Sequence, residues 1–245
     1  MIKNVSIAMA VYNGERFIHK QIESILVQLD HDDELVISYD KSSDRTWEII
    51  KEYEKNNQNI HVFENNDPGV FGNFENAIRN CTGDLIFISD QDDIWCKDKL
   101  QEVKACIERN KADMVIHNGY SIDTDDNVIS ESFFDIYGIR KGVLRNFSKP
   151  RYSGCCTAFT KEFKEIVLPI PRNVGAYDHW LGMVGEVMGK LVFLDKPLIL
   201  HRLHDNNVTP KSQRPLSVII AARFNLLYNL IQRKHLIKSK NNGHK

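Results

Sequence analysis

The densest group of side chains that could bind a metal or act in catalysis is the run of four residues Asp90-Gln91-Asp92-Asp93. Carboxylates packed this closely repel one another unless water or a cation neutralises them. Carboxylate oxygens suit hard divalent cations such as Mg²⁺ or Mn²⁺, and such a cation can neutralise the phosphates of a nucleotide. The motif alone is equally consistent with an acidic turn that caps the next helix, but its position behind an apolar strand favours a metal site.

The segments around this motif alternate between strand-like and helix-like patterns. Short apolar runs rich in β-branched residues predict strands at 5–10, 34–39, 60–63, 85–88 and 114–117. Apolar residues at helical spacing predict helices at 16–28, 45–55, 71–80 and 97–109. This alternation predicts an α/β fold with a mostly parallel central sheet and helices on both faces.

Polar clusters follow three of the predicted strands, at residues 12–13, 40–44 and 90–93. Ligands in folds of this type collect beyond the carboxyl ends of the strands. The three clusters therefore predict a nucleotide-binding crevice at one edge of the sheet.

The second half of the chain is less regular. Residues 128–152 are predicted to be irregular and mobile, residues 178–188 form a predicted helix, and 191–194 and 198–200 are predicted short strands. We expect one domain over 1–210, divided into a nucleotide-binding half at 1–120 and a second half at 121–210. The tail at 211–245 is amphipathic and basic, which suits packing on the domain, dimerisation or contact with an anionic membrane.

Charge and cysteine content restrict the class of protein. The 32 basic residues nearly balance the 33 acidic ones, so nothing indicates a nucleic-acid partner, although a local basic patch remains compatible with this balance. The 5 cysteines have no regular spacing, which favours reduced thiols in a cytosolic protein. The first residues lack the features of a secretory signal, and no apolar run approaches the ~20 residues needed to span a bilayer. We therefore expect a cytoplasmic protein, either free or peripheral at the inner face of the plasma membrane.

Six segments in order resemble glycosyltransferase family 2, the inverting enzymes of the GT-A fold, over roughly residues 3–210. Each segment alone is a weak to moderate signal, but six in the same order are specific. The segments are VSIAMAVYNGERFIHKQIESIL, GVFGNFENAI, TGDLIFISDQDDIWCKDKL, SGCCTAFTKE, YDHWLGMVGEVMG and KPLILHRLHDNNVT.

The resemblance implies roles for particular residues. Asp178 would be the catalytic base, and a divalent metal, Mn²⁺ or Mg²⁺, would be held by Asp92, Asp90 and His204. The residues implied at the donor nucleotide are Val11, Tyr12, Asn13, Asp40, Asn73, Asp90 and Gln91. The residues implied near the donor sugar or acceptor are Asp93, Trp95, Gly154, Cys155, Trp180 and Arg202.

Several of these residues also have a purely structural interpretation. A tryptophan is more often a core residue than a platform for a sugar, which applies to Trp95 and Trp180. Gly154 is equally consistent with a turn, Cys155 with packing, and His204 with a polar strand end. The sequence also departs from the family at Tyr39-Asp40-Lys41-Ser42, where Asp-Asp-Gly-Ser is common, and at Tyr177, where an acidic residue often precedes the base.

The resemblance implies an inverting, metal-dependent glycosyltransferase. It would move a sugar from a UDP- or dTDP-linked donor to a hydroxyl of a saccharide or lipid-linked saccharide, in bacterial surface polysaccharide synthesis. One alternative is a nucleotide-sugar-binding module without turnover, which the altered stretch at 39–41 favours. A sugar nucleotidyltransferase ranks lower, because VYNGERF lacks the Gly-rich basic loop expected after the first strand.

Overall fold

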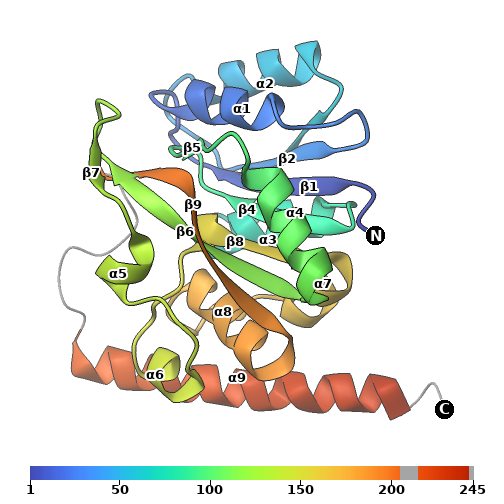
Figure 1. Ribbon diagram of the computed structural model, residues 1–245, viewed down its shortest axis with the longest axis vertical. Helices are drawn as coiled ribbons and strands as arrows, with labels where there is room; N and C mark the ends of the chain where they lie inside the picture. Colours follow the sequence, from blue (N-terminus) through green and yellow to red (C-terminus); the bar gives the residue numbers. More distant parts are fainter. Residues whose placement is uncertain (205–214, 243–245) are drawn as a thin grey trace.

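A mixed nine-stranded sheet forms the centre of the computed structural model, which describes residues 1–204 and 215–242 (Figure 1). The strand order is β3-β2-β1-β4-β8-β6-β9-β5, and β7 pairs with β6. The strands are β1 Val5–Val11, β2 Glu34–Tyr39, β3 Ile60–Glu64, β4 Leu85–Ser89, β5 Ile94–Trp95, β6 Met114–Ile122, β7 Val128–Ser130, β8 Thr157–Thr160 and β9 Leu191–Arg202.

The first half of the chain builds the parallel part of the sheet. β1 pairs in parallel with β2 and β4, and β2 with β3. Every residue of β4 is buried, as expected for an apolar strand covered on both faces. The helices of this half are α1 Ile18–Leu26, α2 Thr46–Asn56, α3 Val70–Asn80 and α4 Lys99–Asn110. The predicted α/β class is confirmed, with its parallel strands concentrated in this half.

The second half extends the same sheet with antiparallel pairs. β8 lies between β4 and β6 and is antiparallel to both, whereas β6 and β9 are parallel. The two short strands predicted at 191–194 and 198–200 are one continuous strand, β9. Its register with β6 slips between the His117–Leu194 and Asn118–Pro197 pairs. Proline cannot donate to the ladder, so an irregularity of this kind accommodates Pro197 within the strand.

Residues 128–152 contain regular elements where the sequence predicts an irregular segment. They include β7, α5 Phe133–Tyr137 and α6 Val143–Ser148. The Ser132 hydroxyl caps α5 by accepting from the Asp135 amide at 3.2 Å, and Gly138 ends the helix at a φ of 60°. The Asn146 side chain ties α6 to α8 through Glu186 at 2.7 Å. These side-chain contacts are non-local or involve single caps, so periodicity does not reveal them.

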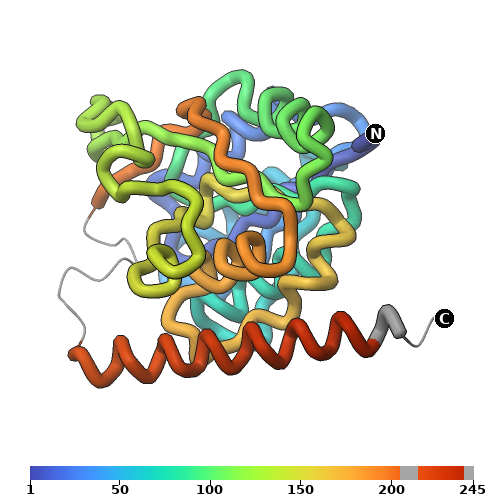
Figure 2. The backbone as a smooth tube through the Cα atoms, turned by 60° about the horizontal axis from the view of Figure 1, so that its bottom comes forward, coloured from blue at the N-terminus to red at the C-terminus, as the bar shows by residue number. Residues whose placement is uncertain are grey.

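The remaining elements are η1 Gly154–Cys156, α7 Lys161–Val167, α8 Tyr177–Met188 and α9 Leu216–Asn242. α9 runs as a long rod along the outside of the body, beside α8 and α6 (Figures 1 and 2). The boundary predicted near residue 210 lies outside the described residues. Among the described helices, none combines the length and apolarity required to cross a membrane.

Candidate active site

The acidic motif forms the loop between β4 and β5, at the carboxyl end of the parallel strands. The Gln21 side chain, on α1, fixes the start of the loop by donating to the Ser89 hydroxyl at 2.8 Å and to the Asp90 carbonyl at 2.9 Å. Asp93 is fully buried. The Gln21 side chain and the burial of Asp93 therefore hold the loop in place without a ligand.

Gln91 joins this loop to the segment after β1. Its side-chain amide donates to the Tyr12 carbonyl at 2.7 Å, and its oxygen accepts from the Tyr12 amide at 2.8 Å. A Cβ at Gly14 would lie 2.5 Å from the Gln91 Oε1. The Gln91 side chain therefore ties two loops together, while the Tyr12 ring is 56% exposed at the same edge.

Two aspartate–histidine pairs connect the acidic loop to the end of β9. In the outer pair, Asp92 Oδ2 lies 2.7 Å from His204 Nε2, and the side chains are 14% and 11% exposed. In the inner pair, Asp93 Oδ1 lies 2.8 Å from His201 Nδ1, and it also accepts from the Arg202 amide at 3.1 Å. Both pairs thus use consecutive acidic residues and one short segment of the chain.

The inner pair belongs to a buried cluster of ligand-type side chains. One such atom each from Asp90, Asp93, Cys155 and His201 lies within 4.8 Å of the others. Burial raises the pKa of Asp93 to about 7, and burial with nearby negative groups raises that of Asp90 well above its usual range. Burial alone would lower the pKa of His201, but the Asp93 carboxylate outweighs it and raises that pKa. The cluster therefore favours taking up positive charge, as protons or as a cation.

Arg202 supports the loop from beneath. Its side chain is 1% exposed, and its guanidinium donates to the carbonyls of Asp92 at 3.0 Å and Asp123 at 2.9 Å. It also pairs with Asp126 at 2.6 Å and lies over the Phe17 ring. The sequence suggested a contact with the donor sugar, whereas the structure gives this side chain backbone partners in the loop.

The residues predicted to bind the nucleotide gather at the ends of β1 and β2. Asp40 is buried, and its carboxylate accepts from the Asn65 side chain at 2.6 Å and the Gly69 amide at 2.8 Å. The Asn73 side chain donates to the Val11 carbonyl at 3.0 Å. Asp40 therefore already orders the loop before α3, and its remaining lone pairs are available to a ligand.

The departure from the family pattern at residues 39–42 has a structural explanation. The Tyr39 ring packs against Trp47 at 4.8 Å, and its hydroxyl accepts from the Ser42 amide at 2.9 Å. Ser42 in turn accepts from the Asn13 amide at 2.9 Å, and Asn13 has a φ of 48°. Tyr39 thus organises the turn by packing, and its ring is turned inward.

Asp178 lies in the first turn of α8, where its Oδ1 accepts from the His179 amide at 2.7 Å. The preceding residue, Tyr177, stacks on Phe74 with ring centres 4.1 Å apart. Burial raises the pKa of Tyr177 well above its usual range, and the negative charges of Asp90 and Asp178 raise it further. The acidic loop and Asp178 therefore both lie close to the Tyr177 side chain.

Gly154 is explained by the same tyrosine. A Cβ at this position would lie 2.0 Å from the Tyr177 hydroxyl oxygen, which no packing tolerates. The neighbouring Cys155 is 1% exposed, with its sulfur 3.2 Å from the Ser153 hydroxyl and 3.8 Å from His201 Nδ1. Gly154 and Cys155 thus lie beside both the inner pair and Tyr177.

Both tryptophans of the predicted sugar site are core residues. Trp95 is 3% exposed, packs on Phe87 and lies 4.2 Å from the Lys99 ammonium. Trp180 has no exposed surface, and its indole donates to the Val167 carbonyl at 2.8 Å. A fully buried ring has no face to offer a sugar, so the packing interpretation fits both residues.

Sequence reasoning missed Lys99, which is buried beneath the site. Its ammonium donates to the Cys155 carbonyl at 2.8 Å, and burial lowers its pKa. It places a positive charge below the acidic cluster. The only signal in the sequence is the Lys-Leu pair that follows the motif, and no periodicity marks it as buried.

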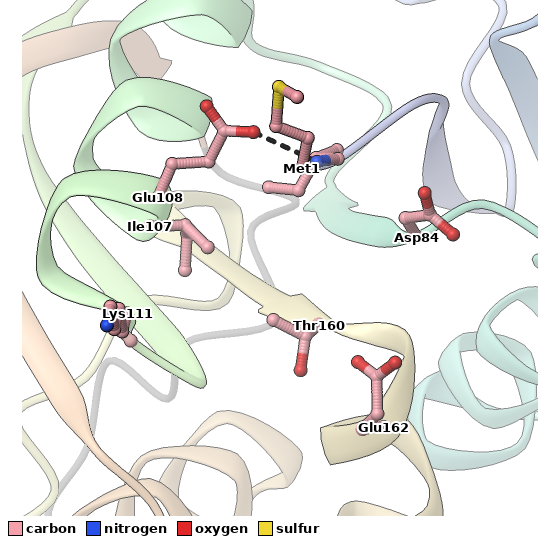
Figure 3. A pocket seen from close by; sticks show the side chains of 9 residues that line it. Met1, Asp84, Ile107, Glu108, Lys111, Thr160 and Glu162 are labelled. Atoms are coloured by element: carbon pink, nitrogen blue, oxygen red, sulfur yellow. Dashed lines mark hydrogen bonds between the residues drawn. The ribbon is translucent and has the colours of Figure 1, made fainter.

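One surface hollow lies away from this site. It is lined by residues near the amino ends of β1 and β4, including Met1, Asp84, Glu108 and Lys111 (Figure 3). The ligand-type residues of the acidic loop do not line it. It therefore has no part in the site described above.

Known structures define the class of the fold as the GT-A glycosyltransferase fold. The structure of S. aureus TarS 1-349 in complex with UDP matches with a TM-score of 0.67 and 19% identity, covering 82% of this chain and 61% of that one. The complex of the same protein with UDP-GlcNAc matches with a TM-score of 0.71 and 17% identity, covering 94% and 66%. This chain therefore spans less than two thirds of those structures.

The family model for Glycosyl transferase family 2 matches residues 6–167, and the chain belongs to this family of glycosyltransferases. It is 30% identical over 219 residues to "dTDP-rhamnosyl transferase RfbG" of Shigella flexneri, covering 81% of this chain and 72% of that protein. It is 26% identical over 242 residues to "Putative teichuronic acid biosynthesis glycosyltransferase TuaG" of Bacillus subtilis, covering 96% and 91%. The resemblance inferred from the six segments is confirmed.

Proposed function

We propose that this chain transfers a sugar, with inversion, from a UDP- or dTDP-linked donor to a hydroxyl of a saccharide or lipid-linked saccharide in bacterial surface polysaccharide synthesis. The names of the relatives support this choice, since one is a dTDP-rhamnosyl transferase and another is named for teichuronic acid biosynthesis. The TarS structures hold UDP and UDP-GlcNAc. The observation that carries the proposal is the series of contacts that brings the start of α8 to the acidic loop: Tyr177 lies against Gly154, the neighbouring Cys155 sulfur is 3.8 Å from His201 Nδ1, and His201 pairs with Asp93 at 2.8 Å.

The residues of the acidic loop fit a divalent cation. Asp92 and His204 offer two ligand atoms 2.7 Å apart at the partly exposed outer pair, and Asp90 is close enough to feel the charge of Asp92. Asp93 adds a buried carboxylate oxygen, Oδ2, that has no hydrogen-bond partner among the described residues. Carboxylates with one imidazole suit Mn²⁺ well, and Mg²⁺ is also compatible with the carboxylates. When bound, the cation would neutralise negative charge on the departing diphosphate.

The protein's own residues then perform the transfer. Asp178 accepts the proton of the acceptor hydroxyl as its oxygen forms a bond to the anomeric carbon. The bond from that carbon to the diphosphate oxygen breaks on the opposite face, so the electron pair leaves with the nucleotide and the configuration inverts. Asp40, with the Tyr12-Asn13 turn, holds the nucleotide, and Gly154 and Cys155 border the donor sugar. Trp95, Trp180 and the Arg202 guanidinium act by supporting the loops.

A comparison of Asp178→Asn with the unmodified protein tests this assignment. The two proteins are incubated with Mn²⁺, UDP- and dTDP-sugars and a saccharide acceptor, and the product and released nucleotide are measured. We expect transfer to fall by about 10²–10⁴-fold with donor affinity retained, because only proton removal is lost. Asp32→Asn, at a side chain that is 85% exposed, is the matched control. Unchanged transfer by Asp178→Asn would remove Asp178 as the base.

A further inference from the structure

α9 has an inner face that is fully used in packing on the body. Leu226 and Leu230 are buried on this face. The Arg233 guanidinium donates to the carbonyls of Ile166 at 2.6 Å and Pro169 at 2.7 Å, and it lies over the Trp180 ring. The helix is therefore anchored in place, and its orientation against the body is fixed.

The outer face of α9 carries a second apolar stripe. Its members follow one another at intervals of one, three or four residues, which places them on one side of a helix. They are Leu216, Ile220, Phe224, Leu227, Tyr228 and Ile231, each between 46% and 71% exposed. Of the 19 large hydrophobic residues exposed in the described part of the chain, 8 lie on α9. An apolar stripe this concentrated marks an interaction surface.

The charged residues of α9 are all basic. Arg233 belongs to the inner face, whereas Lys234 and Lys238 are exposed and Arg223 is partly exposed, and the sequence of α9 contains no acidic residue. A second acid-free segment, between Asp135 and Glu162, carries Arg140, Lys141, Arg145, Lys149 and Arg151. The near-neutral net charge of −1 thus conceals a strong separation of charge along the chain.

These two basic segments are neighbours in space. The Arg223 side chain, on α9, donates to the Ser148 carbonyl at the end of α6, at 3.2 Å. α6 lies across one end of α9 in Figure 1, and the hydrogen bond from Arg223 places the end of α6 against α9. α6 adds exposed apolar residues of its own, Val143 and Leu144, the latter 87% exposed. Cations and apolar side chains therefore continue from one helix to the other.

We propose that this surface docks on a bilayer containing anionic phospholipids. The apolar stripe enters the boundary between headgroups and acyl chains, and the lysines and arginines contact the negative headgroups. Charge complementarity decides between this partner and a second copy of the chain. Two copies pairing through α9 would bring together helices that carry cations and no acids, whereas an anionic surface supplies the missing charge. The inference is independent of which sugar the site transfers.

Vesicle flotation with the full chain tests the proposal. We expect binding to phosphatidylcholine vesicles containing phosphatidylglycerol, weaker binding to phosphatidylcholine alone, and a loss of binding at high salt. Phe224→Ser combined with Leu227→Ser is expected to reduce binding about tenfold or more, since two apolar side chains are removed from the contact. Val27→Ser is the matched control, because Val27 is 80% exposed at the end of α1.

A second variant and a measurement of mass distinguish the outcomes. Lys234→Glu with Lys238→Glu is expected to abolish the preference for phosphatidylglycerol and leave the far-UV circular dichroism unchanged. Equal binding to both kinds of vesicle would overturn the anionic partner. A dimer in sedimentation equilibrium that the Phe224 and Leu227 changes dissociate, together with no vesicle binding, would assign the stripe to a second copy. Nucleotide release by each variant, measured without vesicles, reports separately on the proposed enzyme activity.

Discussion

The inner and outer aspartate–histidine pairs are built from adjacent residues and have nearly the same length, 2.8 Å and 2.7 Å. Their surroundings differ. Asp93 of the inner pair is fully buried and also holds the backbone of β9, although its partner His201 is 18% exposed. In the outer pair the Asp92 side chain is 14% exposed. The difference therefore lies in the two aspartates, since Asp93 fastens the acidic loop to the sheet and Asp92 keeps some contact with solvent.

The largest effect that would test this difference is the loss of stability in Asp93→Ala. Removing one partner of a buried pair leaves the other without compensation, so we expect the free energy of unfolding to fall by about 3–5 kcal/mol. Urea unfolding followed by circular dichroism measures it. Asp92→Ala is the matched change in the outer pair, and we expect it to cost less than Asp93→Ala, because Asp92 is 14% exposed whereas Asp93 is fully buried. Equal losses in the two variants would show that the pairs are equivalent.

Asp92→Asn is expected to cause a large loss of activity, whereas Asp93→Ala is expected to cause a large loss of stability. Metal-dependent release of nucleotide from the donor should fall by about 10²–10³-fold, because the proposed cation would lose a carboxylate ligand and neutralise the diphosphate less well. The assay is nucleotide release at saturating Mn²⁺, with Asp32→Asn as the exposed control. Release that persists at the unmodified rate in Asp92→Asn would refute the metal assignment.

Substitutions of His204 and His201 should distinguish the proposed role in metal binding from the role in stability. His204→Asn is expected to raise the Mn²⁺ concentration for half-maximal nucleotide release by about 10–100-fold. His201→Asn should instead lower the urea midpoint, since the Asp93 carboxylate would lose its buried partner. A titration of activity against Mn²⁺ alongside unfolding curves compares them. If His201→Asn alone shifted the Mn²⁺ requirement, the cation would belong to the inner cluster.

The smallest effect concerns pH. Asp93 and His201 both have raised pKa values in the folded protein, Asp93 to about 7 because of burial and His201 because of the Asp93 charge. The folded state therefore holds these protons more tightly, so their contribution is complete at low pH and is lost as the pH rises through the folded values. The pKa values of the buried His117 and His179 are lowered to about 3 and about 4, so these groups are neutral in this range.

We accordingly expect the metal-free protein to lose stability between about pH 7 and about pH 8.5 through His201, because the Asp93 contribution is already lost between about pH 4 and about pH 7. The slope is at most about 1.4 kcal/mol per pH unit. Urea midpoints measured in EDTA at the two pH values give the slope. His201→Asn should flatten it, and Asp32→Asn is the exposed control. A steeper slope in His201→Asn would contradict the assignment to the inner pair.

The sequence predicted the first half of the fold well because its elements follow from local periodicity. The strands at 85–88 and 34–39 are short apolar runs, and they needed no knowledge of distant residues. The two-residue strand β5 and the slipped register of β9 depend on pairing between residues about a hundred positions apart, Ile94 with Leu200 for example. No local pattern encodes such pairing.

The same difference between local patterns and distant contacts applies to the candidate site. Asp90, Asp92 and Asp93 were found from their type and spacing; the structure pairs Asp92 with His204 and groups Asp90 and Asp93 with Cys155 and His201. The burial of Arg202 and Trp180 could not be predicted from the sequence, because it depends on contacts with distant residues. Arg202 reaches the Asp123 carbonyl, and Trp180 reaches the Val167 carbonyl. A charged or aromatic residue in a family motif therefore identifies an important position without stating whether it contacts the ligand.

The contact between Gly154 and Tyr177 has an evolutionary consequence. With only 2.0 Å between a hypothetical Cβ and the hydroxyl oxygen, no larger residue fits at Gly154 while the tyrosine is retained. Homologues that carry alanine or a larger side chain at the first position should have replaced the aromatic ring at the second, whereas an acidic residue there should relax selection on the glycine. The two sites should covary across a deep alignment, so that the residue before the proposed base predicts which residue occupies the position of Gly154.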